Sequence, residues 1–319
     1  MRKFIGAVVS FAILGVIYWR IDLTRLGAVL GAIDGLWLAL GFLLMAPPIL
    51  LSAWRLKALV PQGVGLRFTE ATKLILAGAV LNMVLPSKMG DIAKAWFMTE
   101  RGRIEGSFAL SLVVFEKAWD LLALLAFCAF GLLAYPGKGP GYWAMTAAVA
   151  VGLATGLAMV SSNGFAQAVF ALALKFAPRG LAPKLEGLRA AWLEMHAYFW
   201  ADGGRAARVI AASVVIWFLH LLQIWIFILA LGAWTPFLAN LALAPLAILA
   251  GLLPLTLAGI GTRDAMLILF YAPYMAAPSG AALGILCTLR YVLPALAGLP
   301  FLGQYLGAVR RVGRGAGPF

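Results

Sequence analysis

Nine charged residues lie inside or beside apolar segments long enough, or nearly long enough, to sit in a membrane. A charge buried in a bilayer is energetically costly, so such residues usually face a cavity or an oppositely charged partner. They are therefore the candidates for chemistry in this sequence, and we expect them to form a substrate-binding site. The nine are Lys88, Asp91, Lys94, Glu116, Lys117, Asp120, Arg263, Asp264 and Arg290.

The spacing of these residues is compatible with two roles. Glu116 and Asp120 share a helical face at a separation of four positions, and Lys117 can pair with Asp120 three positions on. The charges could therefore neutralise one another and hold helices together. They could instead bind an anionic headgroup, because bases at helix breaks, beside backbone N–H groups and helix N-termini, attract phosphate. The bases in such positions are Lys88, Lys94, Arg263 and Arg290.

Signatures of an enzyme are missing from the sequence. It has no Cys/His metal spacing, no plausible Ser–His–Asp/Glu set and no phosphate-cradling loop. We expect no metal and no cofactor, and the lack of a nucleotide-binding block argues against an ATP-driven pump. A secondary transporter remains, driven by an ion gradient or by none. An intramembrane lipid-modifying enzyme with a carboxylate as base is a further alternative.

The composition explains why these charges must lie in a membrane. Of the 319 residues, 64% are hydrophobic and 12% are charged, whereas a soluble domain has roughly 25% charged residues. The net charge of +13 comes mainly from short loops between apolar runs, as the positive-inside rule predicts, so we expect no nucleic-acid partner. The sequence therefore predicts an all-α polytopic membrane protein with a single membrane domain, residues 1–319.

Six apolar segments are predicted to cross the bilayer as helices, because each approaches the length that a hydrocarbon core of about 30 Å requires. The second should be kinked or broken near Pro47-Pro48, and a polar, basic loop is expected to begin at Arg55. We expect Asn82 and Gln223 to hydrogen-bond between helices. The six are Phe4–Trp19, Leu36–Trp54, Ser107–Tyr135, Tyr142–Val160, Val209–Leu231 and Gly280–Leu306.

Two pairs of apolar stretches are too short to cross and meet at tips rich in proline and glycine. Each pair is typical of a re-entrant helical hairpin, which enters and leaves the membrane on the same side. Such backbone is tolerated only where it faces protein or a wet cavity. The first pair is Thr72–Leu85 and Ile92–Met98, around Pro86, and the second is Leu238–Leu253 and Ala265–Tyr274, around Gly259.

The basic residues predict the orientation of the chain. The N-terminus, the loop after the second span, residues 161–208 and the C-terminal arginines should all be cytoplasmic. Within 161–208, the helical spacing of Leu185, Leu188 and Trp192 indicates an amphipathic helix on the cytoplasmic face. Six spans fit this pattern only with two re-entrant hairpins, which divides the chain into two inverted halves, 1–135 and 140–307.

Three motifs, in this order, resemble the flippase-like membrane domain of lysylphosphatidylglycerol synthases and its stand-alone relatives. Members of that family tend to have a proline-glycine-acid-arginine pattern, then Glu-Arg-x-x-Asp, then Gly-Ile-Gly-x-Arg-Glu. This chain has Lys94 and Lys117 where the family has arginine and Asp264 where it has glutamate, which keeps each charge but loses two bidentate forks. The motifs here are Leu85–Lys94, Phe115–Asp120 and Gly259–Asp264, and their order and spacing cover nearly the whole chain.

The resemblance implies that the protein moves an anionic or aminoacylated phospholipid, or a polyprenyl-linked lipid, between leaflets. No aminoacyl-transfer domain follows Phe319, so we expect a flippase and not a synthase. The bases would counter the lipid phosphate, and the acids would position the bases or meet a cationic part of the headgroup. The alternative is a membrane partner that does not transport lipid but presents it to a separate lipid-synthesising enzyme. Either would lie in a bacterial-type inner membrane with both termini cytoplasmic.

Overall fold

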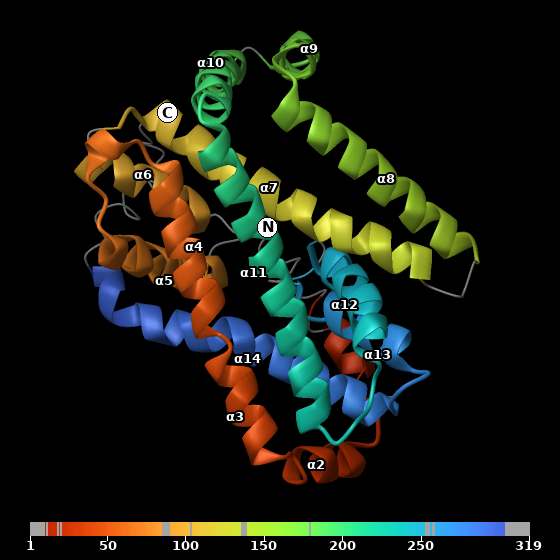
Figure 1. Ribbon diagram of the computed structural model, residues 1–319. Coiled ribbons are helices and arrows are strands. Elements are labelled where there is room, and N and C mark those ends of the chain that lie inside the picture. Colours follow the sequence, from red (N-terminus) through yellow and green to blue (C-terminus); the bar gives the residue numbers. More distant parts are fainter. Residues whose placement is uncertain are drawn as a thin grey trace.

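In the computed structural model, all regular secondary structure in the part of the chain that it describes is helical. That part comprises residues 10, 12–17, 19, 21–84, 90–102, 104–134, 139–178, 180–252, 256 and 259–303. Half of the first predicted span, and residues 85–89, 253–255 and 257–258 of the two hairpin tips, lie outside it. The helices (Figure 1) are α2 (Leu23–Gly31), α3 (Gly35–Leu43), α4 (Ala46–Leu59), the 3-10 turn η1 (Gln62–Val64), α5 (Phe68–Val84), α6 (Gly90–Gly102), α7 (Gly106–Ala134), α8 (Pro140–Ser161), α9 (Asn163–Lys175), α10 (Ala182–Trp200), α11 (Gly203–Ala230), α12 (Phe237–Leu252), α13 (Thr262–Tyr271) and α14 (Ala277–Leu302).

Five helical segments are long and apolar enough to cross a membrane, and they correspond to the second through sixth predicted spans. The first is Gly35–Leu59, which comprises α3 and α4 together. The other four are α7, α11 and α14 and nearly all of α8. The predicted break near Pro47-Pro48 is confirmed: α3 ends at Leu43, and α4 begins at Ala46 with proline in its first turn.

The prediction that a polar loop begins at Arg55 is wrong. The helix α4 continues through Arg55 and Lys57 and ends at Leu59. It continues because apolar residues resume directly after the arginine, and both Leu56 and Leu59 are fully buried in the core. Arg55 is thereby carried into the interior of the helix bundle.

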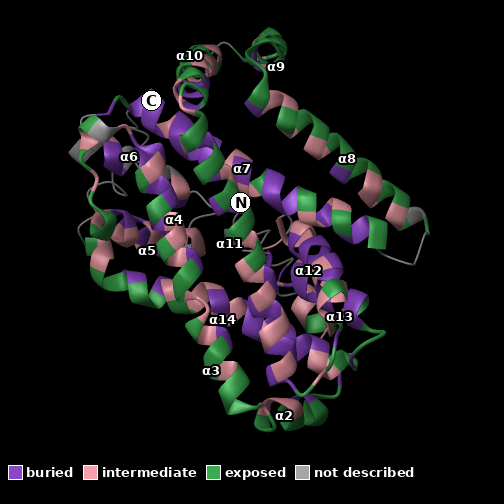
Figure 2. Ribbon diagram, in the orientation of Figure 1, coloured by how far each residue is buried: buried purple, intermediate pink, exposed green. Residues whose placement is uncertain are grey.

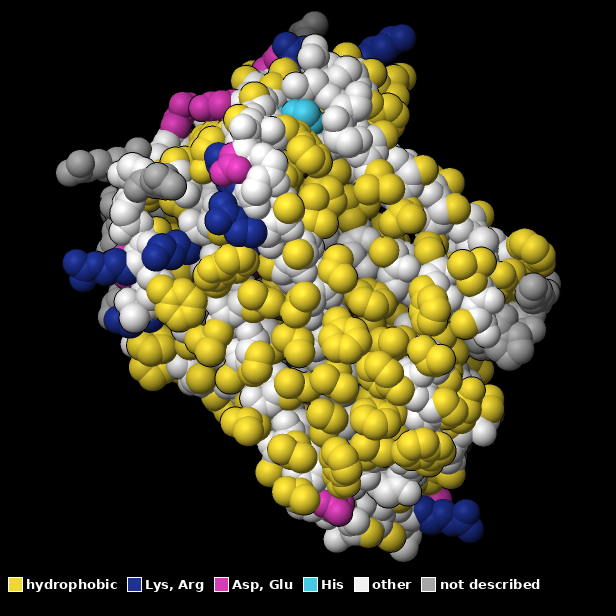
Figure 3. Space-filling model, in the orientation of Figure 1, with side chains coloured by type: hydrophobic (Ala, Val, Ile, Leu, Met, Phe, Trp, Pro, Cys, Tyr) yellow, Lys and Arg dark blue, Asp and Glu magenta, His cyan; other side chains and the backbone are white. Residues whose placement is uncertain are grey.

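The outer surface is that of a protein surrounded by lipid. Hydrophobic side chains cover the middle of the face in Figure 3, whereas Lys, Arg, Asp and Glu gather toward its ends. Buried residues concentrate where α7, α11, α12 and α14 meet, and α8 is largely exposed (Figure 2). Its exposed side chains include Val151 and Leu157, which a hydrocarbon environment accepts. The chain is therefore a multi-pass α-helical membrane protein.

Two pairs of short helices are present where the hairpins were predicted. In each pair the members pack against each other, α5 with α6 and α12 with α13, and the pairs lie on opposite sides of α11 (Figure 1). A methyl group on Gly90 would overlap the carbonyl group of Gly78, and one on Gly259 would overlap that of Gly251. Gly259 also has a φ of +76°, which glycine adopts far more readily than other residues. Backbone contact therefore holds each pair together.

Each pair also packs on a long helix from the other half of the chain. The contacts are α5 with α14 and α12 with α7, while α4 and α11 pack against each other between them. A methyl group on Gly131 of α7 would overlap the carbonyl group of Ala242 in α12. One on Gly298 of α14 would overlap the carbonyl group of Leu76 in α5. The two contacts have the same composition, a glycine of a long helix against the backbone of a short one.

Alanine at either glycine is expected to force these helices apart. Because the added methyl would meet backbone rather than a flexible side chain, we expect Gly131→Ala and Gly298→Ala each to lower the free energy of unfolding by about 1–3 kcal/mol or more. Gly27→Ala in α2 is the control, because among the described residues no atom beyond its own stretch of helix lies within 4 Å of the added methyl. Thermal unfolding in detergent measures the difference, and equal melting temperatures for Gly131→Ala and Gly27→Ala would contradict it.

The basic segment 161–208 forms two helices, α9 and α10, before α11 begins. The predicted amphipathic helix is α10, and its apolar face packs against α7. On α7, the ring of Phe115 lies 5.2 Å from that of Trp192 and 4.8 Å from that of Phe199, measured between centroids. One face of α10 is thus part of the protein core, and it fixes α7 directly beside Glu116.

Candidate functional site

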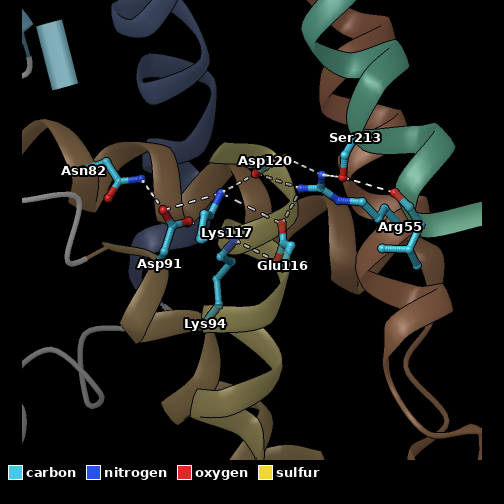
Figure 4. A network of polar contacts seen from close by, with 9 residues as sticks. Arg55, Asn82, Asp91, Lys94, Glu116, Lys117, Asp120 and Ser213 are labelled. Carbon is cyan, nitrogen blue, oxygen red and sulfur yellow. Dashed lines mark hydrogen bonds and ion pairs between the residues drawn. The ribbon is translucent and has the colours of Figure 1, made fainter. Parts of the chain in front are cut away.

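Arg55 is the centre of a buried ionic network, the first charge cluster, formed with Asp91, Lys94, Glu116, Lys117 and Asp120 (Figure 4). Its guanidinium Nη2 donates to Glu116 Oε1 at 2.7 Å and to Asp120 Oδ2 at 3.1 Å. Its Nη1 donates to Asp120 Oδ1 and, at 2.7 Å, to the hydroxyl of Ser213. The side chain is 1% exposed, so these contacts tie α4, α7 and α11 together.

Two lysines complete this cluster from α6 and α7. Lys94 Nζ lies 2.8 Å from Asp91 Oδ1 and 3.5 Å from Glu116 Oε2. Lys117 Nζ lies 3.2 Å from Asp120 Oδ2 and 3.6 Å from Asp91 Oδ2. The cluster therefore holds three basic and three acidic side chains, and their formal charges cancel.

The members of the first charge cluster differ in how far they are exposed. The side chains of Lys94 and Glu116 are 2% and 1% exposed, whereas that of Lys117 is 41% exposed. Asp91 and Asp120 are intermediate, at 14% and 16%. Lys117 is therefore the member of this cluster most accessible to a ligand.

A second charge cluster, Arg263, Asp264 and Arg290, lies where α13 meets α14. Arg263 donates to Asp264 Oδ1 from Nε at 2.9 Å and from Nη2 at 2.6 Å. It also donates to the hydroxyl of Thr288 at 2.7 Å and to the carbonyls of Gly284 and Cys287 at 3.2 and 3.3 Å. The backbone N–H of Gly261 donates to Asp264 Oδ2 at 3.0 Å. These bonds join the turn before α13 to the middle of α14.

The ring of Tyr291 lies near the guanidinium groups of both Arg290 and Arg263, and it connects Arg290 to the second charge cluster. Its guanidinium carbon lies 5.1 Å from the ring centroid of Tyr291, and that of Arg263 lies 5.7 Å from the same centroid. Arg290 donates to the Tyr291 hydroxyl at 3.0 Å and to the carbonyl of His220 at 3.2 Å. A ring placed near two guanidinium groups is favourable electrostatically.

One face of α11 meets both clusters. Arg55 bonds to Ser213, and Arg290 bonds to the backbone of His220. Seven residues make two helical turns, so these positions lie on the same face, about 10 Å apart along the axis. Any tilt or rotation of α11 would therefore move the surroundings of both arginines together.

The structure brings eight of the nine predicted site residues into these two clusters, and the ninth, Lys88, lies outside the described residues. The prediction missed Arg55 and Ser213. The predicted interhelical role of Gln223 is confirmed, because its Nε2 donates to the carbonyl of Gly41 at 2.7 Å. Among the described residues, no group of three or more His, Cys, Asp or Glu side chains is placed to hold a metal ion.

Comparison with known proteins identifies the domain that carries these clusters. The family model for the lysylphosphatidylglycerol synthase TM region matches residues 3–298. The chain belongs to this family. Its sequence is also similar to the UPF0104 membrane protein MJ1595 of Methanocaldococcus jannaschii, at 23% identity over 314 residues and 91% of each chain.

Membership of the lysylphosphatidylglycerol synthase TM family confirms the resemblance drawn from the three motifs. At two motif positions this member has lysine, and the structure shows what that lysine does. Lys94 and Lys117 each contact more than one carboxylate as compact point charges. The fork that pairs with both Glu116 and Asp120 comes from Arg55, which lies outside the three motifs.

Proposed function

We propose that this protein is a flippase, a secondary transporter that moves an anionic or aminoacylated phospholipid, or a polyprenyl-linked lipid, between leaflets. Membership of a family named for a lipid synthase is consistent with a lipid-related role in the membrane. The observation that carries the proposal is Lys117, the partly exposed edge of an otherwise buried ionic network. A lipid headgroup could enter there while its acyl chains stay in the bilayer.

The lengths of the short helices support the re-entrant hairpins of this proposal. α5 and α6 have 17 and 13 residues, and α12 and α13 have 16 and 10. A helix needs about 20 residues to cross the hydrocarbon core, so each pair fits better as two arms that return to the same side. The charges of α6 and α13 would then lie within the membrane near the turns.

A repeated spacing supports two inverted halves. Pro86 and Pro254, at the hairpin tips, are 168 positions apart. Adding the same 168 positions to Gly131 leads to within one position of Gly298, and subtracting them from Ala242 leads to within two positions of Leu76. The Gly131–Ala242 contact is thus related to the Leu76–Gly298 contact.

The shift also relates polar positions of the two clusters. It takes Asp120 to Thr288 and Glu116 to Gly284, and both of these α14 residues bind Arg263. Lys94, which meets Glu116, is taken to the neighbour of Arg263. Such repeats are typical of transporters whose sites lie near the midplane.

The setting we propose is a bacterial-type cell membrane. The basic segment 161–208 and both termini would lie in the cytoplasm, as the positive-inside rule favours. The bilayer and its anionic lipids would be the partners. We propose no enzymatic step, because the clusters offer charge pairing and no nucleophile beside a free base.

Exchange of fluorescent lipids between leaflets of reconstituted vesicles tests this function. We expect wild-type protein to exchange an anionic lipid faster than empty vesicles, and Lys117→Gln to slow exchange about tenfold or more, because a hydrogen bond to a charged group is worth about 1.5–3 kcal/mol. Lys57→Gln, at an exposed lysine of α4, is the matched control and should behave as wild type. No exchange by wild-type protein would leave the alternative of a protein that presents lipid to an enzyme.

A further inference from the structure

Arg290 is a buried cation without an acidic partner in the part of the chain that the structure describes. The residue is 5% exposed, and its two bonds are to neutral acceptors, the carbonyl of His220 and the hydroxyl of Tyr291. Its Nε is buried and has no acceptor among the described residues. Each other buried arginine or lysine, Arg55, Lys94 and Arg263, has at least one carboxylate within 4 Å.

Eleven of the twelve Asp and Glu side chains are described, and none of them is paired with Arg290. The twelfth, Glu100, belongs to α6, which packs mainly against α5 and α7, and the charged residues of the segments outside the described ranges are all lysine or arginine. The first charge cluster is neutral, and in the second, Asp264 balances Arg263. One positive charge is left over, at Arg290.

A surplus charge in this position needs a counter-ion from outside the chain. Burying an ion without an opposite charge is strongly unfavourable, and the penalty is offset only by good pairing and further hydrogen bonds. Guanidinium groups are well suited to phosphate, because their N–H donors match two phosphate oxygens at once.

We infer that Arg290 binds the singly charged phosphodiester of a membrane lipid. This deepens the proposed function and rests on it for the idea that the bound lipid is cargo. The charge count selects the class of lipid: one phosphodiester carries one negative charge and balances the site. A diphosphate would leave excess negative charge, and an aminoacyl ester would add a cation beside Arg263 and Arg290.

The position of Arg290 on α14 also suits a lipid. Leu293 and Leu296 are 37% and 54% exposed, and Leu293 lies on the same helical face about one turn beyond the arginine. The backbone positions of Arg290 and Leu293 are separated by a rise of only about 4.5 Å along the axis of α14. A phosphodiester could therefore reach the guanidinium while its acyl chains lie along α14.

Lipid binding to the purified full chain in detergent tests the inference. Native mass spectrometry and thermal unfolding would be followed while dioleoyl phosphatidylglycerol, zwitterionic dioleoyl phosphatidylcholine, lysylphosphatidylglycerol or inorganic phosphate is added. We expect phosphatidylglycerol to bind at least about tenfold more tightly than the other lipids and to raise the melting temperature. Arg290→Gln should remove that preference, and Arg25→Gln, at an exposed arginine of α2, should keep it.

Lipid-free Arg290→Gln protein gives a second readout. Since the variant removes an unbalanced buried charge, its melting temperature without lipid should equal or exceed that of wild type. Tighter binding of lysylphosphatidylglycerol, equal binding of phosphatidylcholine, equal stabilisation by inorganic phosphate, or an unchanged preference in Arg290→Gln would each overturn the inference. The wild-type comparison of lipids stands even if a variant does not fold.

The leaflet-exchange assay separates this inference from the proposed function. Selective binding of phosphatidylglycerol that depends on Arg290, without any exchange, would support the inference and contradict the flippase. Exchange that persists in Arg290→Gln, with no lipid preference in wild type, would overturn the inference and leave the flippase standing.

Discussion

Replacing Arg55 by glutamine is expected to lower the free energy of unfolding by about 3–5 kcal/mol, because removal of one partner leaves buried charges uncompensated. The guanidinium meets Glu116 and Asp120 and also bonds to Ser213. Lys94 and Lys117 would remain, so the three carboxylates of the cluster would be left with two cations. Glutamine can donate hydrogen bonds at this position but supplies no charge.

Unfolding by sodium dodecyl sulfate in mixed micelles measures this difference. Arg25→Gln is the control, because the Arg25–Asp22 pair has side chains 80% and 52% exposed, and exposed pairs contribute about 0–1 kcal/mol. The double variant Arg55→Gln/Glu116→Gln should recover part of the loss, since it restores charge balance. If Arg55→Gln unfolds at the same point as Arg25→Gln, the network does not stabilise the fold.

Much of the helix layout could be predicted from the sequence because a bilayer fixes the length of a span. The segments Val209–Leu231 and Gly280–Leu306 were predicted from apolar length, and the helices Gly203–Ala230 and Ala277–Leu302 overlap them closely. The short helices before and after Pro86 were predicted because proline and glycine interrupt an apolar run. These signals are local, and they required no knowledge of packing.

The membership of the first charge cluster was only partly predictable, for a physical reason. Helical spacing relates residues three or four apart, so Lys117 and Asp120 could be paired from the sequence, and their contact at 3.2 Å confirms this. Arg55 comes from α4, which is separated from α7 in the sequence by α5 and α6, and Ser213 comes from α11. Such contacts depend on how helices pack, which spacing along one helix does not specify.

One signal could have revealed Arg55. The apolar sequence resumes at Leu56 and includes Leu59, so the charge lies within a helical run and does not end it. A charge count gives no such signal, because the bases predicted beside Asp91, Glu116 and Asp120 are Lys88, Lys94 and Lys117, which already balance them.

Replacing Arg263 by glutamine should destabilise the other half of the molecule by about 3–5 kcal/mol, because Asp264 would be left buried without its cation. The side chain of Asp264 is 7% exposed. Its Oδ2 accepts the N–H of Gly261, whose φ is +103°, so the carboxylate also holds the turn that begins α13. Arg263→Lys should lose less, since it keeps the charge but cannot reproduce the fork that reaches Asp264 and Thr288 together.

The region that loses stability in Arg263→Gln can be identified by hydrogen exchange, which is a more specific test than a melting temperature. Arg263 bonds α13 to α14 through Gly284, Cys287 and Thr288, so hydrogen exchange in Arg263→Gln should rise first in α13. In Arg55→Gln it should rise first in α4 and in α7 around Glu116. The surface variant Arg189→Gln, at an exposed pair with Glu186, should change neither. Uniform loss of protection across all helices in Arg263→Gln would contradict a local role, and would mean that the two clusters stabilise one cooperative unit joined through α11.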